Sequence, residues 1–308
     1  MSRRGLLSEE ELKIATKTKF ISTDHEAFEL FFEDCKLRNL RPHTLKYYRE
    51  QFQAVKSSLI NMNDKDIKTL ILDMQNQGLK VTTINSRLRA LRSFYNFLHK
   101  NKHIKKNPMA DVKLLKERKQ AVNSLSKEQL ALLFSLCDQK TFVGLRDYTI
   151  MMLLVDSGIR LNELVGLEVS DIRDNDILVR QTKTYFERVL PISDKMKEQL
   201  NIYLKIRGKA NTEALFINQD GGALKPRSIQ NRIEHYGKLS GIEGVRISCH
   251  TFRHTHARLF IQNGGSAFHL QSMLGHTSME VTKRYVNLFA NDVADSHKKY
   301  SPLNNFFH

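Results

Sequence analysis

Cysteine is scarce in this chain, and its few copies are not arranged for metal binding or cross-linking. Of the 308 residues only Cys35, Cys137 and Cys249 are cysteines, and no two of them form a CxxC pair. A structural zinc site or a disulfide framework needs paired or closely spaced cysteines. The pattern therefore argues against both and fits a protein of the reducing cytoplasm.

Long apolar segments are missing as well. Mean hydropathy is −0.43, and no segment has the length and apolar character of a membrane span. The first residues, MSRRGLLSEEELK, contain a short apolar pair followed by glutamates, unlike a secretory signal. Hydrophobic residues still make up 41% of the chain, which is enough for a globular core. We therefore expect no membrane partner.

Acidic residues are outnumbered, 33 against 49 Lys and Arg, which leaves a net charge of +16. Such an excess attracts a polyanion, most commonly nucleic acid, with an anionic membrane surface as the competitor. Residues 79–120 hold twelve Lys or Arg and only two acidic residues, so ten of the sixteen net charges lie there. We favour phosphate contact over a merely solvated helix face. The candidate DNA-binding residues are Lys80, Arg87, Arg89, Arg92, Lys105 and Lys106.

The spacing of apolar residues predicts the organisation of the first third of the chain. Between residues 28 and 98, four segments carry apolar residues at steps of three and four, which predicts four helices with short connections. We expect an N-terminal arm over 1–21, a helical domain over 22–115 and a basic linker over 116–123. Asn107-Pro108 is predicted to end the last helical pattern.

The remaining residues, 124–308, are predicted to form a second, mainly helical domain with a C-terminal tail. Ser126-Lys-Glu-Gln has a helix-start pattern, and residues 148–155 are apolar nearly all round, as in a buried central helix. Residues 177–180 and 188–192 have strand character and are joined by a polar turn. The expected fold class is mainly α with a small antiparallel β-sheet.

Several residues of the second domain are candidates for chemistry, although each alone has an ordinary explanation. Arg160 follows the buried helix and a glycine, but it also suits a surface ion pair with Glu163. Lys183 lies in the turn between the strands, where solvated lysines are common. His276 suits a helix cap or a core, and Tyr285 suits a half-buried tyrosine.

His250 and Arg253 are three residues apart and therefore share a helical face. The spacing of His250 and His254 also allows a helical zinc pair, but it lacks the glutamate of HExxH and an obvious third ligand. We therefore predict no metal site. His254 and His256 are expected to pack or to support the site.

Together these segments resemble the tyrosine recombinase family (phage integrases, XerC-XerD-like). In that family a GxRxxEL box is followed by a lysine in a β-hairpin, an HxxR box, an LGH box and a tyrosine nine residues later. This chain has them in the same order, at Arg160, Lys183, His250, Arg253, His276 and Tyr285. Residues 83–98 also resemble the last helix of the family's core-binding domain. Threonines flank Lys183 where the family usually has glycines.

The resemblance implies a core-binding (SAM-like) DNA-binding domain followed by a catalytic domain. It implies a site-specific recombinase that breaks and rejoins duplex DNA through a 3′-phosphotyrosine at Tyr285. Arg160 and Arg253 would bind the non-bridging phosphate oxygens, since their planar forks match phosphate. Lys183 would protonate the departing 5′ oxygen.

The remaining matched residues have supporting roles in the same resemblance. His250 would help to move the tyrosine proton, His276 would hydrogen-bond the phosphoryl oxygens, and Glu163 would orient the arginine box. No cofactor is implied, because the phosphotyrosine keeps the bond energy without ATP and clustered cations replace a metal. The implied partners are duplex DNA with a specific core site and a homotetramer on that DNA; a need for accessory DNA-bending proteins stays open.

The resemblance further implies a cytoplasmic, nucleoid-associated protein of a prokaryote that serves a mobile element or resolves replicons. Three other functions fit part of the pattern. A type IB topoisomerase shares the catalytic residues but relaxes DNA without exchanging partners. A sequence-specific DNA-binding regulator would keep the fold without chemistry, and a basic scaffold protein would bind nucleic acid or membrane without sequence preference.

Overall fold

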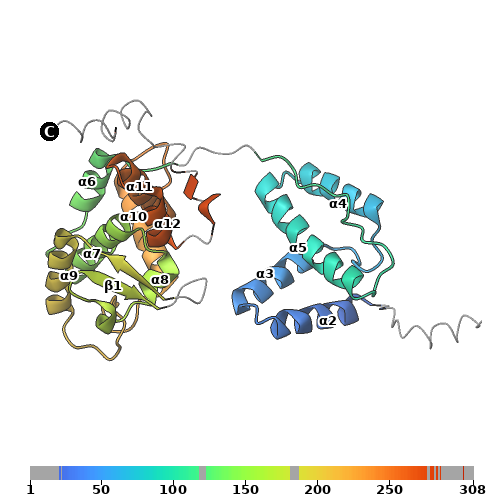
Figure 1. Ribbon diagram of the computed structural model, residues 1–308, viewed down its shortest axis with the longest axis horizontal. Coiled ribbons are helices and arrows are strands. Elements are labelled where there is room, and N and C mark those ends of the chain that lie inside the picture. Colours follow the sequence, from blue (N-terminus) through green and yellow to red (C-terminus); the bar gives the residue numbers. More distant parts are fainter. Residues whose placement is uncertain are drawn as a thin grey trace, which may run out of the picture. The chain divides into compact units, whose positions relative to one another are not determined.

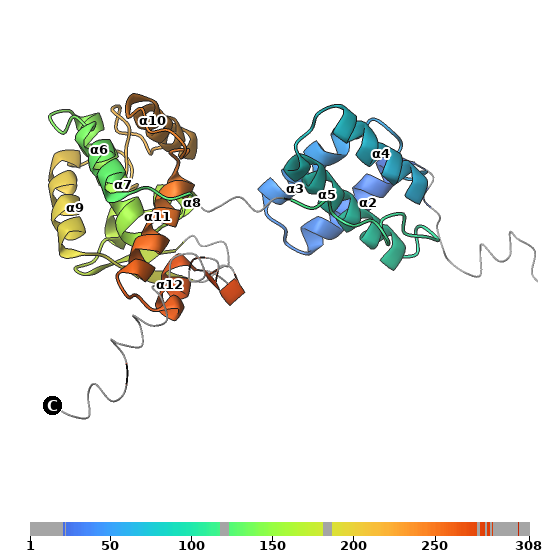
Figure 2. The same ribbon diagram turned by 90° about the horizontal axis from the view of Figure 1, so that it is seen from above.

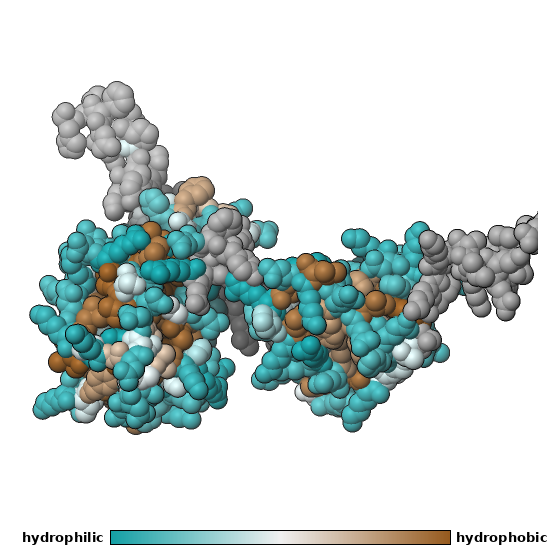
Figure 3. Space-filling model, turned by 90° about the horizontal axis from the view of Figure 1, so that it is seen from below, coloured by the Kyte–Doolittle hydropathy of each residue, from teal (hydrophilic) through white to brown (hydrophobic). Residues whose placement is uncertain are grey.

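The chain divides into two compact units, Met1–Gln120 and Ala121–His308 (Figure 1 and Figure 2). The computed structural model describes residues 21, 23–117, 123–180, 187–275, 278–280, 282–283, 285 and 301. Polar residues cover most of the face seen in Figure 3, with apolar residues showing between them. No helix in the described part of the chain is long and apolar enough to cross a membrane.

In the first unit one long helix packs against three others. The helices of its described residues are α2 (Asp24–Leu37), α3 (Pro42–Gln53), α4 (Asp64–Asn76) and α5 (Val81–Lys100). Along α5, Ile84, Leu88, Leu91 and Phe94 recur every three or four residues and are buried, and α5 contacts each of the other three helices. This apolar stripe explains both the helix and the face it buries. The predicted helical character of this segment is confirmed.

Local capping chemistry sets where α2 and α4 begin. The Thr23 hydroxyl accepts a hydrogen bond from the Glu26 N–H at the start of α2. Asn63 and Asp66 form a reciprocal capping box at the start of α4. Each contact satisfies backbone N–H groups that have no partner inside the helix.

The end of α5 differs from the prediction. The helix stops at Lys100, several residues before Asn107. Lys102 adopts a left-handed φ of 58°, which a continuing right-handed helix does not allow. Asn107 instead reaches back to α5, where its amide donates to the Asn96 side chain at 2.8 Å.

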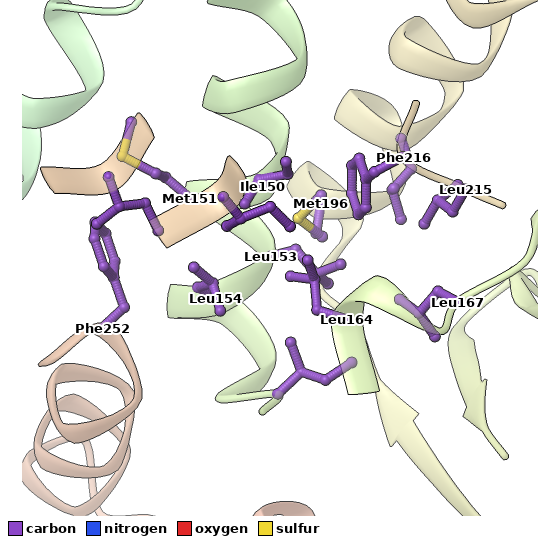
Figure 4. Close-up of a cluster of buried hydrophobic side chains, with 14 of the residues drawn as sticks. Ile150, Met151, Leu153, Leu154, Leu164, Leu167, Met196, Leu215, Phe216 and Phe252 are labelled. Carbon is purple, nitrogen blue, oxygen red and sulfur yellow. The ribbon is translucent and has the colours of Figure 1, made fainter. Parts of the chain in front are cut away.

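The second unit is built around α7 (Phe142–Ser157). This helix contacts α9 (Asp194–Arg207), α10 (Pro226–Leu239) and α11 (Cys249–Gln262). Figure 4 shows the core around it, formed by the buried residues Ile150, Met151, Leu153, Leu154, Leu164, Leu167, Met196, Leu215, Phe216 and Phe252. Burial of one such side chain contributes about 2 kcal/mol. Contacts on several sides explain why this segment is apolar all round, as predicted for a central helix.

The smaller elements arrange themselves around this core. They are α6 (Lys127–Ser135), α8 (Leu161–Val165), the 3-10 turn η1 (Val169–Asp171) and α12 (Ala267–Leu274). Ser126 and Gln129 form the capping box of α6, as their pattern predicted. The strands β1 (Asp176–Val179) and β2 (Arg188–Pro191) pair antiparallel. The fold class, mainly α with a small antiparallel sheet, is confirmed.

A glycine turn connects the central helix to the arginine box. Gly158 ends α7 with a left-handed φ of 62°, which favours glycine. A Cβ at this position would lie 2.6 Å from Cδ2 of His256. Both the conformation and the close approach of α11 therefore require glycine, and the turn fixes where Arg160 emerges two residues later.

Candidate active site

Arg160 and Glu163 form an ion pair at the start of α8, in which the carboxylate is buried and the guanidinium is partly exposed. A carboxylate oxygen of Glu163 accepts from the Arg160 N–H at 3.0 Å, and the other accepts from Nη1 of the Arg160 guanidinium at 2.9 Å. Glu163 is 3% exposed. The ion pair considered from the sequence thus exists, but it lies inside the unit and holds the guanidinium of Arg160 in one orientation.

Arg188 joins this pair from the β-sheet, which the sequence did not predict. Its Nη1 and Nη2 donate to the two carboxylate oxygens of Glu163 at 2.8 and 2.7 Å, a bidentate contact. Its Nε donates to the carbonyl of Met273 on α12 at 3.2 Å. The one available signal was strand alternation, because Arg188 shares a face with the buried Leu190. Arg188 therefore ties the hairpin to both α8 and α12.

Arg253 of α11 completes a cluster of three guanidinium groups. It is 5% exposed, and its Nη1 and Nη2 donate to the carbonyls of Gly158 and Leu274, both at 2.6 Å. Nη2 of Arg160 donates to the next carbonyl, that of Gly275, at 2.8 Å. The structure thus brings Arg160 and Arg253 together at the end of α12, although 93 positions separate them in the chain.

The electrostatics of this cluster favour an anion. Burial, together with the nearby charge of Arg160, lowers the pKa of Arg253 to about 9, and the attraction of Glu163 does not offset these effects. Burial raises the pKa of Glu163, but hydrogen bonds and charge from Arg188 and Arg160 lower it below its ordinary value overall. The carboxylate is therefore ionised at neutral pH, and the cationic charge around it is only partly compensated.

Tyr285 lies beside this cluster and meets a histidine. Its phenol oxygen is 2.7 Å from Nδ1 of His254, and the two ring centres are 5.5 Å apart. Tyr285 is 4% exposed and packs with Ala257, Leu270 and other apolar residues of α11 and α12. It is also near enough to Arg253 to act on the pKa of that guanidinium. The phenol of Tyr285 and the two arginines of the sequence pattern therefore belong to one site.

The three histidines of α11 have different surroundings. His256 is buried, with Nδ1 2.8 Å from the carbonyl oxygen of Val155, which is the packing role expected of it. His254 was expected to pack or support the site, and the structure instead places it directly at the tyrosine oxygen. His250 lies one turn earlier and is exposed, its ring centre 4.3 Å from that of His254. Within the described part of the chain, no three His, Cys, Asp or Glu side chains gather to hold a metal.

Two predicted site residues lie outside the described residues. Lys183 falls in the segment 181–186 between the two strands, and His276 directly follows Gly275. Their neighbours in the chain are described. Arg188 begins β2 five residues after Lys183, and Gly275 accepts from Arg160. The roles of Lys183 and His276 remain predictions.

The predicted DNA-binding residues of the first unit have varied surroundings. Lys80 is the exposed N-cap of α5, and no acidic residue lies in the first turn of that helix. Lys105 is exposed and Arg87 is half-buried. Lys106 has a carboxylate neighbour, since its Nζ lies 3.2 Å from Asp64.

Arg89 and Arg92 both contact the segment that follows α5. Arg89 lies 3.9 Å from the Glu117 carboxylate. Arg92 is half-buried and donates to the carbonyl of Val112. These contacts give Arg92 a structural role that its position in the charge run did not predict.

Comparison with known proteins assigns the family. Residues 123–292 match the family model described as "Phage integrase family", and residues 28–102 match that of "Phage integrase, N-terminal SAM-like domain". The chain is 32% identical over 260 residues to the tyrosine recombinase XerC of Actinobacillus pleuropneumoniae serotype 7, an alignment that covers 80% of this chain and 83% of that protein. The chain belongs to the phage integrase family of tyrosine recombinases. The predicted resemblance is confirmed.

Solved structures of tyrosine recombinases share the fold. The Tn1549 transposon integrase in complex with transposon right end DNA has a TM-score of 0.73 and 21% identity, over 90% of this chain and 98% of that one. A lambda integrase tetramer bound to a Holliday junction has a TM-score of 0.70 and 21% identity, over 88% and 82% of the two chains. Members of this family catalyse DNA strand exchange, so this tyrosine recombinase is an enzyme of that class.

Proposed function

We propose that this tyrosine recombinase cleaves and rejoins duplex DNA at a specific core site through a 3′-phosphotyrosine bond to Tyr285. The observation that carries the proposal is the convergence of the Tyr285 phenol with the guanidinium cluster around Glu163. The nucleophile and the groups that bind an anion come from elements far apart in sequence and meet in one place. In-line attack on a phosphodiester needs such a nucleophile beside such a binding site.

Arg160 and Arg253 bind the non-bridging oxygens of the scissile phosphate. Both guanidinium groups are fixed by protein acceptors before DNA arrives, so little reorganisation is needed when charge develops in the transition state. A guanidinium carries five N–H donors in a planar fork that matches phosphate. Loss of one well-placed donor costs about 3 kcal/mol of transition-state stabilisation.

The other matched residues complete the proton transfers. Lys183 protonates the 5′ oxygen as it leaves, and His276 hydrogen-bonds the phosphoryl oxygens. Glu163 orients Arg160 and Arg188 and takes no proton itself. His250 assists the removal of the tyrosine proton from its exposed position beside His254. Reversal of these steps with a new 5′ hydroxyl joins the exchanged strand, and no ATP is consumed.

The first unit binds the DNA flanking the cleavage position. Lys80, Arg87, Arg89, Arg92, Lys105 and Lys106 are the proposed phosphate contacts, with the linker over residues 116–123. Lambda integrase forms a tetramer on a Holliday junction, which supports a homotetramer of this chain on two core sites. One structural neighbour is named a transposon integrase, and several relatives of this chain are named tyrosine recombinase XerC. Movement of a mobile element or resolution of a replicon is the proposed biological setting.

Trapping of the covalent intermediate tests this function. A duplex that binds the protein is first selected from a random-sequence pool and then nicked beside the cleavage position, so that the short released strand diffuses away. Because the attacking oxygen belongs to Tyr285, the wild type should form a protein–DNA adduct in EDTA, and Tyr285→Phe should form none. Tyr148→Phe, in which a half-buried tyrosine of α7 is changed, should keep the adduct. The proposal would be contradicted if Tyr285→Phe formed an adduct, or if the wild type formed none in EDTA.

A plasmid with two selected sites separates recombination from relaxation. Strand exchange should give recombinant circles or deletions that depend on Tyr285. Relaxed plasmid without recombinants would indicate a topoisomerase. Full biological activity of Tyr285→Phe would indicate a regulator that only binds DNA.

A further inference from the structure

The nucleophile has a direct partner outside the family pattern. Nδ1 of His254 lies 2.7 Å from the phenol oxygen of Tyr285, within hydrogen-bond distance. His254 directly follows Arg253 on α11, so the helix that supplies a phosphate-binding guanidinium also supplies the group that meets the nucleophile. His250, the histidine of the HxxR box, is one turn away and exposed, with its ring against that of His254.

We propose that His254 is the base that takes the phenol proton of Tyr285 during strand cleavage. The inference rests on the proposed function and deepens it. As the Tyr285 oxygen attacks, its bond to phosphorus forms and the bond from phosphorus to the 5′ oxygen breaks. The phenol proton moves to Nδ1 of His254, and the 5′ oxygen takes a separate proton from Lys183. In the joining step both protons return, so the cycle leaves the enzyme unchanged.

The surroundings of His254 suit a base that becomes effective only on DNA. Burial, together with the neighbouring His250 and Arg253, lowers the pKa of His254 to about 4. The ring is therefore neutral at neutral pH, and with its proton on Nε2 it presents Nδ1 as an acceptor to the phenol. A phosphate held by Arg160 and Arg253 adds negative charge beside the ring, which favours its protonated form. Without that phosphate, proton transfer from Tyr285 is unfavourable and the nucleophile stays protonated.

The position of Tyr285 agrees with this resting state. Apolar residues of α11 and α12 surround the ring, and only 4% of the residue is exposed. Water therefore has little access to the phenol, so a proton acceptor supplied by the protein is needed at the moment of attack. His254 occupies that position in the structure.

Two substitutions at this position separate base catalysis from positioning. In His254→Asn, the side-chain oxygen is close to the place of Nδ1 and still accepts from the phenol, but an amide cannot take the proton. His254→Ala removes both functions. Single-turnover cleavage of the selected nicked duplex is the readout, measured from pH 6 to pH 9. Thermal unfolding and DNA binding of each variant show whether it is folded.

We expect both variants to bind the duplex and to cleave it about 100- to 1,000-fold more slowly than wild type at pH 7, the usual effect of losing a general base. The deficit should shrink as pH rises. It should also shrink when Tyr285 is replaced by a fluorinated tyrosine, whose more acidic phenol needs no base. His269→Gln, the matched control, changes an exposed histidine of α12 and should cleave the duplex at the wild-type rate across this pH range.

Several outcomes would overturn the inference. Cleavage by His254→Asn within threefold of wild type would do so. A deficit that stays constant across pH and with the fluorinated phenol would assign His254 a structural role instead. Failure of the proposed function gives a different result, because the wild type would then form no adduct or Tyr285→Phe would form it as well.

Discussion

Glu163 shows at the scale of one residue how the site is held together. A carboxylate that is 3% exposed carries a large desolvation cost, which is offset only by close and well-oriented partners. Arg188 supplies a bidentate contact, and Arg160 donates to one oxygen from its guanidinium and to the other from its backbone N–H, so both oxygens are satisfied. Arg188 matters beyond its own contacts, because without it the Glu163 charge loses half of its compensation while remaining buried.

Arg188→Gln should therefore be strongly destabilising. Removing one partner of a buried ion pair costs about 3–5 kcal/mol, so the free energy of unfolding in urea should fall by that amount. Arg188→Lys keeps the charge but not the planar fork and should have a smaller effect. Cleavage of the nicked duplex should fall in both variants, because Glu163 also orients Arg160.

A surface arginine of the same unit provides the control for this prediction. Arg173 lies 3.8 Å from the Asp176 carboxylate, and its side chain is 50% exposed. Arg173→Gln should change the unfolding free energy by less than about 1 kcal/mol, as for other exposed pairs. If Arg188→Gln lowered the free energy of unfolding as little as this control, Arg188 would not be needed to stabilise the buried carboxylate of Glu163.

The site residues that could not be identified from the sequence are those that act through contacts with distant parts of the chain. Arg160, Glu163, Arg253 and Tyr285 were found by family pattern, whereas the contacts that Arg188 and His254 make with them were not. Arg188 lies 25 positions from Glu163, and no local periodicity links them. His254 was marked by its spacing from His250, but the spacing alone could not show that Tyr285 would reach it across 31 positions.

At the scale of elements, prediction succeeded where the determinant is local. Ser126 and Gln129 carry the start of α6 in their own side chains, and a regular apolar stripe sets α5 along its length. The predicted end of α5 was wrong, because the helix end depends on the left-handed conformation of Lys102 and on the hydrogen bond from Asn107 back to Asn96. Neither feature can be recognised from a periodic pattern, whereas Asn107-Pro108 is a strong turn signal in the sequence.

The helix α11 should make the second unit sensitive to acid. Partial or full desolvation lowers the pKa of His250, His254 and His256, that of His254 to about 4 from an ordinary 6.5. Between about pH 6.5 and pH 4 the unfolded chain therefore binds more protons than the folded one at these positions. Folding stability rises with pH wherever that holds, so it should fall as pH is lowered through this window.

Thermal unfolding measured from pH 7.5 to pH 4.5 checks this expectation. The melting temperature should fall over the range, and His254→Asn should flatten the decline because one titrating group is removed. His269→Gln, which changes an exposed histidine of α12, should leave the slope unchanged. Equal slopes in the wild type and His254→Asn would show that His254 does not contribute to the acid sensitivity.

At the scale of the whole molecule, Leu115 and Leu125, on either side of the undescribed residues 118–122, are each hydrogen-bonded within their own unit. In the first unit, the amide group of Asn85 bonds both backbone groups of Leu115 at 2.9 Å. In the second unit, the N–H of Leu125 donates to the Thr255 hydroxyl at 2.9 Å. These contacts are made by α5, which carries proposed DNA contacts, and by α11, which carries Arg253 and His254.

The basic charge of the first unit should divide into DNA contacts and structural contacts. Lys80 occupies the N-cap position of α5 without a side-chain cap, and its side chain is exposed at a helix end where backbone N–H groups also attract phosphate. A cation there is unfavourable for the helix dipole itself, so Lys80→Ala should not lower the melting temperature. It should weaken DNA binding and reduce the slope of log affinity against log salt by about 0.9, the share of one phosphate contact.

In Arg92→Ala the loss of DNA binding should be accompanied by a lower melting temperature, because the change also removes a half-buried guanidinium from the carbonyl of Val112. Binding titrations from 50 to 300 mM salt, with thermal unfolding of the same variants, distinguish the roles of Lys80 and Arg92. An unchanged slope for Lys80→Ala would remove Lys80 from the DNA-binding surface.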